Sequence, residues 1–317
     1  MKNYFEEFID INGIRQYFLH YPGSADTVII FMHGGPGQSE AYFSYLTAPT
    51  TAYCTFVFYD QRGTGKTQAE NKSSTDDITI STLIEDLKET VCYIRKKYAP
   101  SRVILLGHSW GTILGMEYLK KYSNTVSAYI GMGQVVNFMQ GEKIGFEYCR
   151  QQIERANKKS DLKKLDRLEN YPFNINEKNA SAIFGKMRML QMKYKLAGYS
   201  KGNGKMFSML LKSPVFSLRD VPSLLLSAGK SKNLMQYLLT YDTSGYTNFD
   251  IPIFFICGRN DWQVPSVLAE KYFSSISAPA KNLFWIENAG HLTDIENSSD
   301  YHAAVKSICQ NVHELVH

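Results

Sequence analysis

The stretch from Arg102 to Ile113, RVILLGHSWGTI, decides the fold of this chain. Residues 102–106 form a short apolar run typical of a buried strand, and the apolar spacing from Ile113 to Tyr122 is helical. Between them, Gly107-His108-Ser109-Trp110-Gly111 supplies the small residues that a tight strand-to-helix turn needs. Such a turn holds its serine in a strained, exposed conformation, at a helix N-terminus that favours negative charge. We therefore predict that Ser109 is a nucleophile; a purely structural turn is the alternative.

The segments on either side of this stretch repeat its strand–helix rhythm. Two runs flank Asn12-Gly13, a dipeptide suited to a hairpin turn. Further apolar, β-branched runs alternate with segments of helical periodicity, which is typical of a parallel sheet covered by helices on both faces. The sequence thus predicts an α/β fold. Its expected strands are 5–11, 14–21, 27–32, 55–59, 102–106, 126–132, 251–257 and 282–286, and its expected helices outside the middle segment are 80–94, 113–122, 267–273 and 301–315.

The middle of the chain breaks this rhythm. Residues 134–245 contain helical runs and no convincing strand, and we expect a loop at 201–204. This segment holds 19 basic and 9 acidic residues, a net charge of +10, whereas the rest of the chain carries −5. We predict a core domain of residues 1–133 and 246–317 with a helical cap domain, 134–245, inserted in it. The positive charge indicates either a solvated helical surface or attraction of anionic ligands.

Composition excludes several classes of protein. The chain has 317 residues, 44% hydrophobic and 21% charged, which is ordinary globular usage. No run approaches the roughly 18 apolar residues of a membrane span, and glutamates interrupt the N-terminal segment where a signal peptide would be apolar. We therefore expect a cytoplasmic protein with no membrane partner. The net charge of +5 is too small to indicate nucleic-acid binding, and the five scattered cysteines form no zinc-ligand pattern.

A serine hydroxyl is a weak nucleophile and needs a base that is oriented by an acid. Asp261 follows the expected strand 251–257, and His291 follows the expected strand 282–286. Both would lie at the carboxyl ends of parallel strands, the edge at which ligands bind in open α/β sheets. We predict that Ser109, Asp261 and His291 form a catalytic triad.

An oxyanion hole needs two N–H donors fixed in advance, and a glycine-rich segment offers one of them. His33-Gly34-Gly35-Pro36-Gly37 follows the expected strand 27–32, and its glycines let bare backbone approach a ligand. We assign the two donors to the backbone of Gly35 and of Trp110. Gly34 in place of Gly35 remains open, and so does a plain Gly-Pro turn.

Gly63-Thr64-Gly65-Lys66-Thr67 is similar to a phosphate-binding loop, but two features argue against that function. A Walker A loop needs a glycine five positions before Gly65, and that position is Asp60. The loop should also open a helix, whereas the residues from Gln68 onward are polar and loop-like. We expect no nucleotide cofactor.

Together these segments resemble the proline iminopeptidase branch of the α/β-hydrolases. The resemblance rests on five segments between residues 33 and 296: His33–Gly37, Asp60-Gln-Arg-Gly63, Gly107–Gly111, Gly258-Arg-Asn-Asp261 and Gly290-His291. It implies the α/β-hydrolase fold with a cap, and release of an N-terminal residue from short peptides without metal or other cofactor. It further implies that Ser109 is the nucleophile, His291 the general base and acid, and Asp261 its orienting partner. Asp60, Arg62 and Glu296 would then have supporting roles.

The substrate is less defined by the sequence. Iminopeptidases hold the substrate ammonium with carboxylates, and some have a glutamate directly after the triad aspartate, where this chain has Trp262. Candidate substrate-binding residues are Glu142 and Glu147, with surface helix positions as the alternative, together with Trp262 and His108. We expect His108 either to line the pocket or to be structural. The partner would be a short peptide or another small molecule. An esterase or amidase for a small, anionic acyl substrate and a non-catalytic binding protein are the competing hypotheses, and the oligomeric state is undetermined.

Overall fold

The computed structural model describes residues 3–23, 26–48, 53–72, 78–176, 178–198, 203–223 and 232–314. Its centre is an eight-stranded sheet in the order β1-β2-β4-β3-β5-β6-β7-β8. Strand β2 pairs antiparallel with β1 and β4, and the remaining pairs are parallel, which confirms the predicted mostly parallel α/β sheet. The strands are β1 (Phe5–Ile11), β2 (Ile14–Tyr21), β3 (Thr27–Met32), β4 (Thr55–Tyr59), β5 (Arg102–His108), β6 (Ala128–Met132), β7 (Ile253–Gly258) and β8 (Lys281–Ile286).

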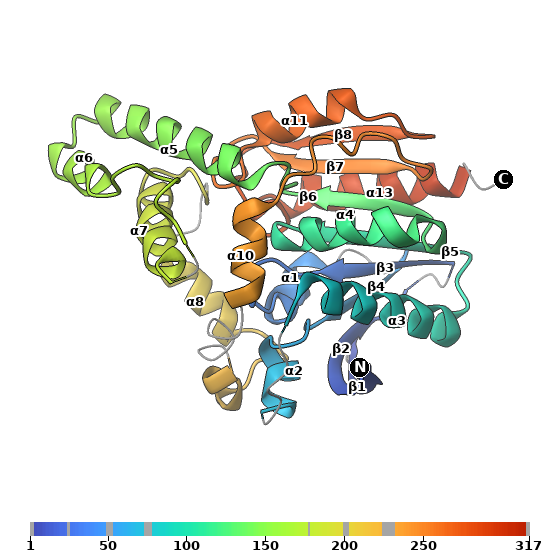
Figure 1. Ribbon diagram of the computed structural model, residues 1–317. Helices are drawn as coiled ribbons and strands as arrows, with labels where there is room; N and C mark the ends of the chain where they lie inside the picture. The colour runs from blue at the N-terminus through green and yellow to red at the C-terminus, as the bar shows by residue number, and fades with distance from the viewer. Residues whose placement is uncertain are drawn as a thin grey trace.

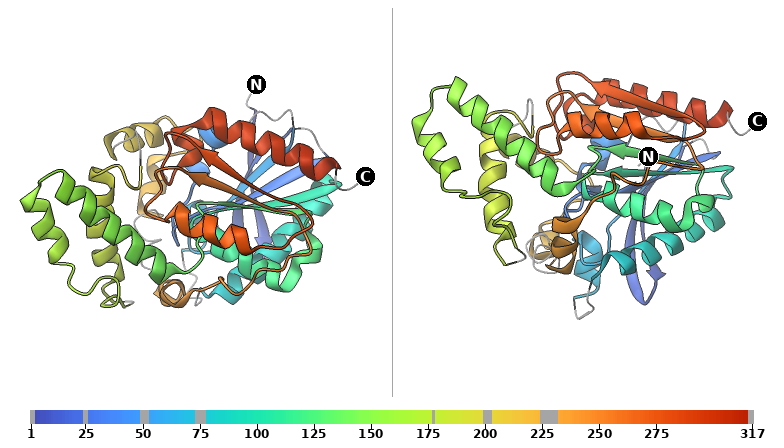
Figure 2. Two further views of the ribbon diagram at one scale, coloured as in Figure 1. Left: turned by 90° about the horizontal axis from the view of Figure 1, so that it is seen from above. Right: turned by 45° about the horizontal axis from the view of Figure 1, so that its top comes forward.

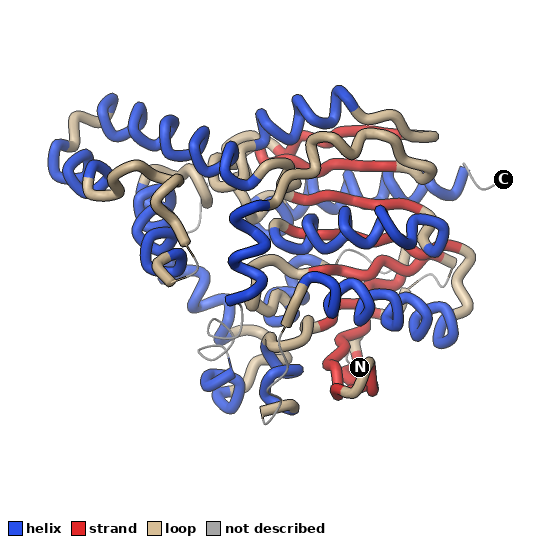
Figure 3. Tube along the Cα trace, viewed as in Figure 1, coloured by secondary structure: helices blue, strands red, loops and turns tan. Residues whose placement is uncertain are grey.

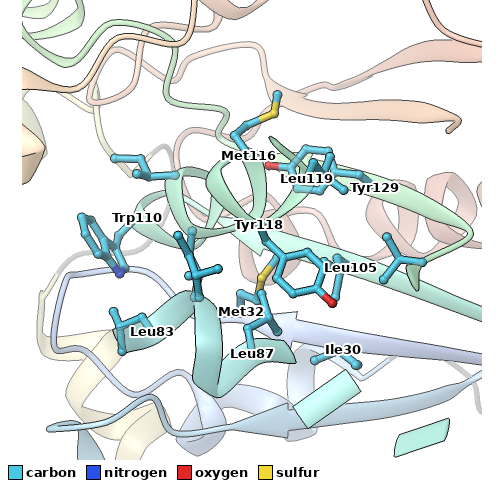
Figure 4. Close-up of a cluster of buried hydrophobic side chains, with 14 of the residues drawn as sticks. Ile30, Met32, Leu83, Leu87, Leu105, Trp110, Met116, Tyr118, Leu119 and Tyr129 are labelled. Atoms are coloured by element: carbon cyan, nitrogen blue, oxygen red, sulfur yellow. The ribbon is translucent and has the colours of Figure 1, made fainter. Parts of the chain in front are cut away.

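Helices cover both faces of the sheet (Figures 1 and 2). On one face lie α3 (Ile80–Tyr98), α4 (Trp110–Tyr122) and α11 (Ser266–Ser275), and on the other lies α13 (Ser298–Glu314). The central strands are apolar on both sides because both sides are packed; every residue of β3 and β5 is buried. Figure 4 shows side chains of β3, β5, α3 and α4 meeting in one of the two resulting cores.

Among the described residues between β6 and β7, the regular elements are helices, apart from two isolated bridges, Asn137 with Asp242 and Asn248 with Ser277. We call residues 134–245 the cap segment. Most of its helices lie beside the sheet (Figure 3), and α5, α6 and α7 share a small apolar core of their own. Its elements are α5 (Phe138–Arg155), α6 (Lys159–Asp166), α7 (Ala180–Lys193), α8 (Asn203–Leu211), η3 (Leu218–Asp220) and α10 (Lys232–Thr240). The loop expected at 201–204 is wrong in its second half, because residues 203–204 begin α8, while 201–202 lie outside the described residues.

A second correction concerns the segment that resembles a phosphate loop. Gly65 does open a helix, α2 (Gly65–Glu70), which the polar sequence did not predict. Tertiary contacts hold it: Thr67 accepts from the Tyr17 amide and donates to the Asp60 carbonyl. The N-terminus of α2 is occupied by the buried Asp60 carboxylate, which accepts from the Lys66 amide at 2.7 Å and lies where a Cβ on Gly65 would clash. A carboxylate at this position leaves no space for a phosphate.

Candidate active site

Ser109 lies at the turn between β5 and α4. Its φ of 52° and ψ of −115° are unusual for a residue with a side chain, and conformations of this kind cluster at functional sites. The turn is held by its own backbone, since the Ser109 amide donates to the Met132 carbonyl at 3.0 Å and its carbonyl accepts from the Thr112 amide at 2.9 Å. A Cβ at Gly111 would lie 2.0 Å from the Met32 carbonyl oxygen, so only glycine lets the turn pack against the end of β3.

Asp261 and His291 are brought together from separate loops. His291 Nδ1 lies 2.7 Å from Asp261 Oδ2, and both side chains are almost fully buried. The other carboxylate oxygen accepts from the amides of Gln263 and Val264 at 3.0 and 2.9 Å. Because the Asp261 carboxylate only accepts, Nδ1 of His291 carries the hydrogen, which leaves Nε2 as the basic nitrogen.

The end of β6 links this pair to Ser109. Met132 accepts from the Ser109 amide, and the next residue, Gly133, has a φ of 57°. A Cβ on Gly133 would lie 3.0–3.1 Å from the His291 ring and 3.5 Å from Asp261 Oδ2. The serine turn, the histidine and the aspartate therefore surround one short backbone segment, as expected at the carboxyl edge of the sheet.

The glycine-rich loop lies against the serine. A Cβ on Gly34 would be 3.3 Å from the Cβ of Ser109, and Gly35 has a φ of 124°. The ring of His33 fixes this loop: Nε2 accepts from the Gln61 amide at 3.0 Å, so Nδ1 carries the hydrogen and donates to the Gly34 carbonyl at 2.8 Å. Burial lowers the pKa of His33, which favours this neutral form. The peptide that carries the Gly35 N–H is thereby held in one orientation.

Trp110, the other predicted donor, is the first residue of α4, so its amide belongs to the N–H groups that have no partner within the helix. Its indole Nε1 donates to Gln61 Oε1 at 3.1 Å, and the Gln61 amide group in turn donates to the His33 carbonyl at 3.0 Å. Gln61 thus joins the two segments that supply the predicted donors. The sequence analysis did not single out Gln61, although it lies within the Asp60–Gly63 segment.

His108 does not point to open space but lies beside the predicted base. Its ring centroid is 4.8 Å from that of His291, and its Nε2 is 3.0 Å from the His291 carbonyl oxygen. Nδ1 lies 2.6 Å from the carboxylate of Glu40. Burial alone would lower the pKa of His108, but Glu40, with Asp294 and the His291 carbonyl, raises it to about 9. No sequence signal identified Glu40, because the contact joins residues 68 positions apart.

The two cap glutamates have different environments. Glu142 is buried and forms a double ion pair with Arg188 and a hydrogen bond from Tyr171, so its charge is already neutralised. Glu147 is 57% exposed and lies 3.9 Å from Lys143 on the surface of α5. Glu147 thus lies at a surface helix position, the alternative that the sequence analysis gave for it.

Trp262 connects the loop after Asp261 to the cap segment. Its ring stacks on Tyr148 of α5 at a centroid distance of 3.5 Å, and its amide donates to the Leu196 carbonyl at 2.8 Å. The next carbonyl, that of Ala197, accepts from the His291 amide at 2.7 Å. One stretch of the cap segment therefore holds the backbone beside both Asp261 and His291.

Two further residues support the loops as the resemblance implied. Glu296 accepts from the Gly290 amide at 2.6 Å, directly before His291. Arg62 forms a double hydrogen bond with Asp86 and also donates to the Asn12 carbonyl, so it ties the turn between β1 and β2 to α3.

A small crevice lies between the start of α5 and the loop after Asp261. It is lined by residues 134–138, 141–142, 263–265 and Leu268, mostly through apolar atoms, and its volume of about 20 Å³ holds about one water molecule.

Among the described residues, no group of three or more His, Cys, Asp or Glu side chains could hold a metal ion. No helix in the described part of the chain is long and apolar enough to cross a membrane.

Residues 27–298 match the α/β-hydrolase fold family, and the chain belongs to it. Among its relatives is a "probable aminopeptidase YbaC" of Bacillus subtilis, 27% identical over 278 residues that cover 86% of this chain and 85% of the relative. A proline iminopeptidase of Heyndrickxia coagulans is 26% identical over 329 residues, which cover 98% of this chain and 100% of that relative.

Solved structures share the fold at low identity. A proline iminopeptidase of Mycobacterium smegmatis superposes with a TM-score of 0.71 at 14% identity, covering 99% of this chain and 100% of that one. An esterase of Exiguobacterium antarcticum gives a TM-score of 0.63 at 15% identity, covering 96% and 99%. The fold alone therefore accommodates both peptidase and esterase activity.

Proposed function

We propose that this α/β-hydrolase is a serine hydrolase in which Ser109 is the nucleophile, His291 the general base and acid, and Asp261 the residue that orients His291. The observation that carries the proposal is the buried hydrogen bond of 2.7 Å between His291 Nδ1 and Asp261 Oδ2, next to a serine held at positive φ. This pairing leaves Nε2 of His291 to act on the serine hydroxyl.

In the proposed reaction, Nε2 of His291 takes the proton of the Ser109 hydroxyl while the oxygen attacks the substrate carbonyl carbon. The carbonyl oxygen becomes an oxyanion, which the amides of Gly35 and Trp110 stabilise. His291 then gives its proton to the leaving nitrogen as the C–N bond breaks. Water, activated by His291 in the same way, hydrolyses the acyl-enzyme and restores Ser109.

For the substrate, we propose a short peptide from which the enzyme releases the N-terminal residue. The support is the naming of relatives that match most of the chain as aminopeptidase and proline iminopeptidase. Glu142 is the better of the two predicted partners for a substrate ammonium because it is buried near the entry of the cap segment and beside the crevice, whereas Glu147 is exposed.

The contacts of Glu142 favour a second candidate, an esterase or amidase. Arg188 already neutralises the Glu142 carboxylate through two hydrogen bonds, so a substrate ammonium would have to compete with a guanidinium for it. The net charge of +10 on the cap segment also attracts anions rather than cations.

The test is hydrolysis of L-proline β-naphthylamide, alanine β-naphthylamide and p-nitrophenyl acetate by the purified protein, with Ser109→Ala as the control. An aminopeptidase releases naphthylamine, needs a free α-amine and is inactive once that amine is acetylated. Hydrolysis of the acetate alone supports the second candidate. Equal turnover by a pure, folded Ser109→Ala protein would overturn the serine mechanism.

A further inference from the structure

Three loops that serve the proposed reaction meet at one buried contact. Glu40 follows the oxyanion loop, and a Cβ on Gly34 would lie 3.1 Å from Glu40 Oε1. His108 precedes Ser109 in the serine turn. Its ring joins Glu40 at 2.6 Å through Nδ1 and the backbone carbonyl of His291 at 3.0 Å through Nε2. The chain Glu40–His108–His291 thus connects all three loops.

The geometry limits where the protons lie. A carbonyl oxygen only accepts, so Nε2 of His108 carries a hydrogen. The contact of 2.6 Å between Nδ1 of His108 and the Glu40 carboxyl group then contains one further proton. Either His108 carries it, as an imidazolium beside a carboxylate, or Glu40 carries it, as a carboxylic acid beside a neutral imidazole. Because Glu40 raises the pKa of His108 to about 9, the imidazolium–carboxylate form is the stable one at neutral pH.

We infer that Glu40 and His108 are positioning residues, an ion pair that fixes the backbone of His291 and balances the charge of the His108 ring with a carboxylate. This inference rests on the proposed function, since it assigns a role within the same site. His291 donates its amide hydrogen to Ala197 and accepts on its carbonyl from His108, so both sides of its backbone are held. The ring is then free to move only about its side-chain torsions, within the limits set by Asp261.

The balancing carboxylate of Glu40 matters because the rings of His108 and His291 are 4.8 Å apart. A lone imidazolium at that distance would oppose the positive charge that His291 gains during the reaction. With Glu40 ionised, the pair is neutral as a whole. The other titratable groups facing it are Asp294 of α12 (Thr293–Glu296), whose pKa burial raises to about 7, His33 of the oxyanion loop and Tyr301 of α13. Oδ1 of Asp294 and Oε2 of Glu40 are buried without a hydrogen-bond partner among the described residues.

The experiment is the pH profile of kcat/KM for the wild-type full chain and for Glu40→Gln. It uses whichever of the three chromogenic substrates the wild-type protein hydrolyses fastest. Glutamine keeps the shape and can still bond to Nδ1, but it removes the charge. Without the Glu40 carboxylate, the pKa of His108 falls from about 9, because burial then lowers it without that opposing charge. We expect kcat/KM to fall by up to roughly tenfold at its optimum and the acid side of its profile to gain a second ionisation. Glu89→Gln, an exposed position on α3, is the matched control and keeps the wild-type profile.

A profile of Glu40→Gln that runs parallel to wild type would overturn the inference, because a merely structural role lowers the rate equally at every pH. Nitrogen NMR of the wild-type protein gives a second measurement that does not need the variant to fold: both nitrogens of His108 should be protonated at pH 7, and a neutral ring would also overturn it. Fluorophosphonate labelling of wild-type Ser109 separates the two proposals. No labelling rejects the proposed function, whereas labelling with a parallel profile rejects only the role of Glu40.

Discussion

At the scale of single residues, both carboxylate oxygens of Asp261 accept hydrogen bonds. Its Oδ1 is committed to the amides of Gln263 and Val264, so an asparagine at this position must keep its oxygen there. The side-chain NH₂ would then face His291 Nδ1 and force the wrong tautomer, with no basic nitrogen toward Ser109.

We therefore predict that Asp261→Asn lowers kcat by about 10⁴-fold while the melting temperature stays close to that of wild type. Steady-state kinetics and thermal unfolding measured on the same preparation check this. Retention of more than about a tenth of the activity would contradict the assigned orienting role.

Asp60 tests, also at the scale of a single residue, how burial changes the pKa of a carboxyl group. It is fully buried, and burial raises the pKa of its carboxyl to about 7 despite hydrogen bonds from Ser39 and the Lys66 amide. Between about pH 4 and 7 the folded protein holds this proton and the unfolded chain, with an ordinary aspartate, has lost it. The folded state then binds more protons, so stability falls as pH rises through this window.

Asp60→Asn removes that titration. We expect the variant to lose less stability than wild type between pH 4 and 8, by on the order of 1 kcal/mol or more. Urea unfolding at several pH values measures it, with Asp10→Asn at an exposed position of β1 as control. Identical slopes of stability against pH for Asp60→Asn and wild type would contradict the burial argument.

At the scale of elements, helix α5 contains two glycines with opposite surroundings. A Cβ on Gly145 would lie 2.5 Å from the backbone oxygen of Trp262, whereas a Cβ on Gly141 would make ordinary contact with Pro265 at 3.6 Å. Alanine in a helix is favoured over glycine by about 1 kcal/mol, and this gain is the same at both sites. The difference between the two variants therefore isolates the packing of α5 against the loop after Asp261.

We predict that Gly141→Ala is neutral to stabilising, by up to about 1 kcal/mol, and that Gly145→Ala is destabilising and lowers kcat, because α5 must move away from Trp262. Thermal unfolding and kinetics on both variants provide the measurement. Equal stabilisation by the two would show that α5 does not press on this loop.

At the scale of the whole molecule, the cap segment is joined to the loops that carry the proposed triad residues Asp261 and His291. The amides of Trp262 and His291 donate to neighbouring carbonyls, those of Leu196 and Ala197. Undocking of this stretch exposes both amides in a single event, although they lie 29 positions apart in the sequence.

We expect the two amides to show similar hydrogen-exchange protection by NMR. Tyr148→Ala, which removes the stack on Trp262, should speed exchange at both by roughly 2- to 10-fold. Phe173→Ala, at an exposed cap position, is the control. Faster exchange at Trp262 alone would show that the two loops are not coupled through the cap segment.

The sequence by itself determined the fold and the residues proposed to react. Every strand and the four long helices that cover the sheet, α3, α4, α11 and α13, were predicted within a few residues, because buried strands and helices carry apolar runs of recognisable period. Ser109, Asp261 and His291 could be chosen because each directly follows a predicted strand, and parallel strands end at one edge.

Only the tertiary structure decided which polar side chains meet. The Glu40–His108 contact, the Arg188 that neutralises Glu142, and the helix at Gly65, which Tyr17 contacts through Thr67, all depend on residues distant in sequence. Local propensity and spacing carry no information about such pairs, since a buried charge is tolerated only where the fold brings a partner to it.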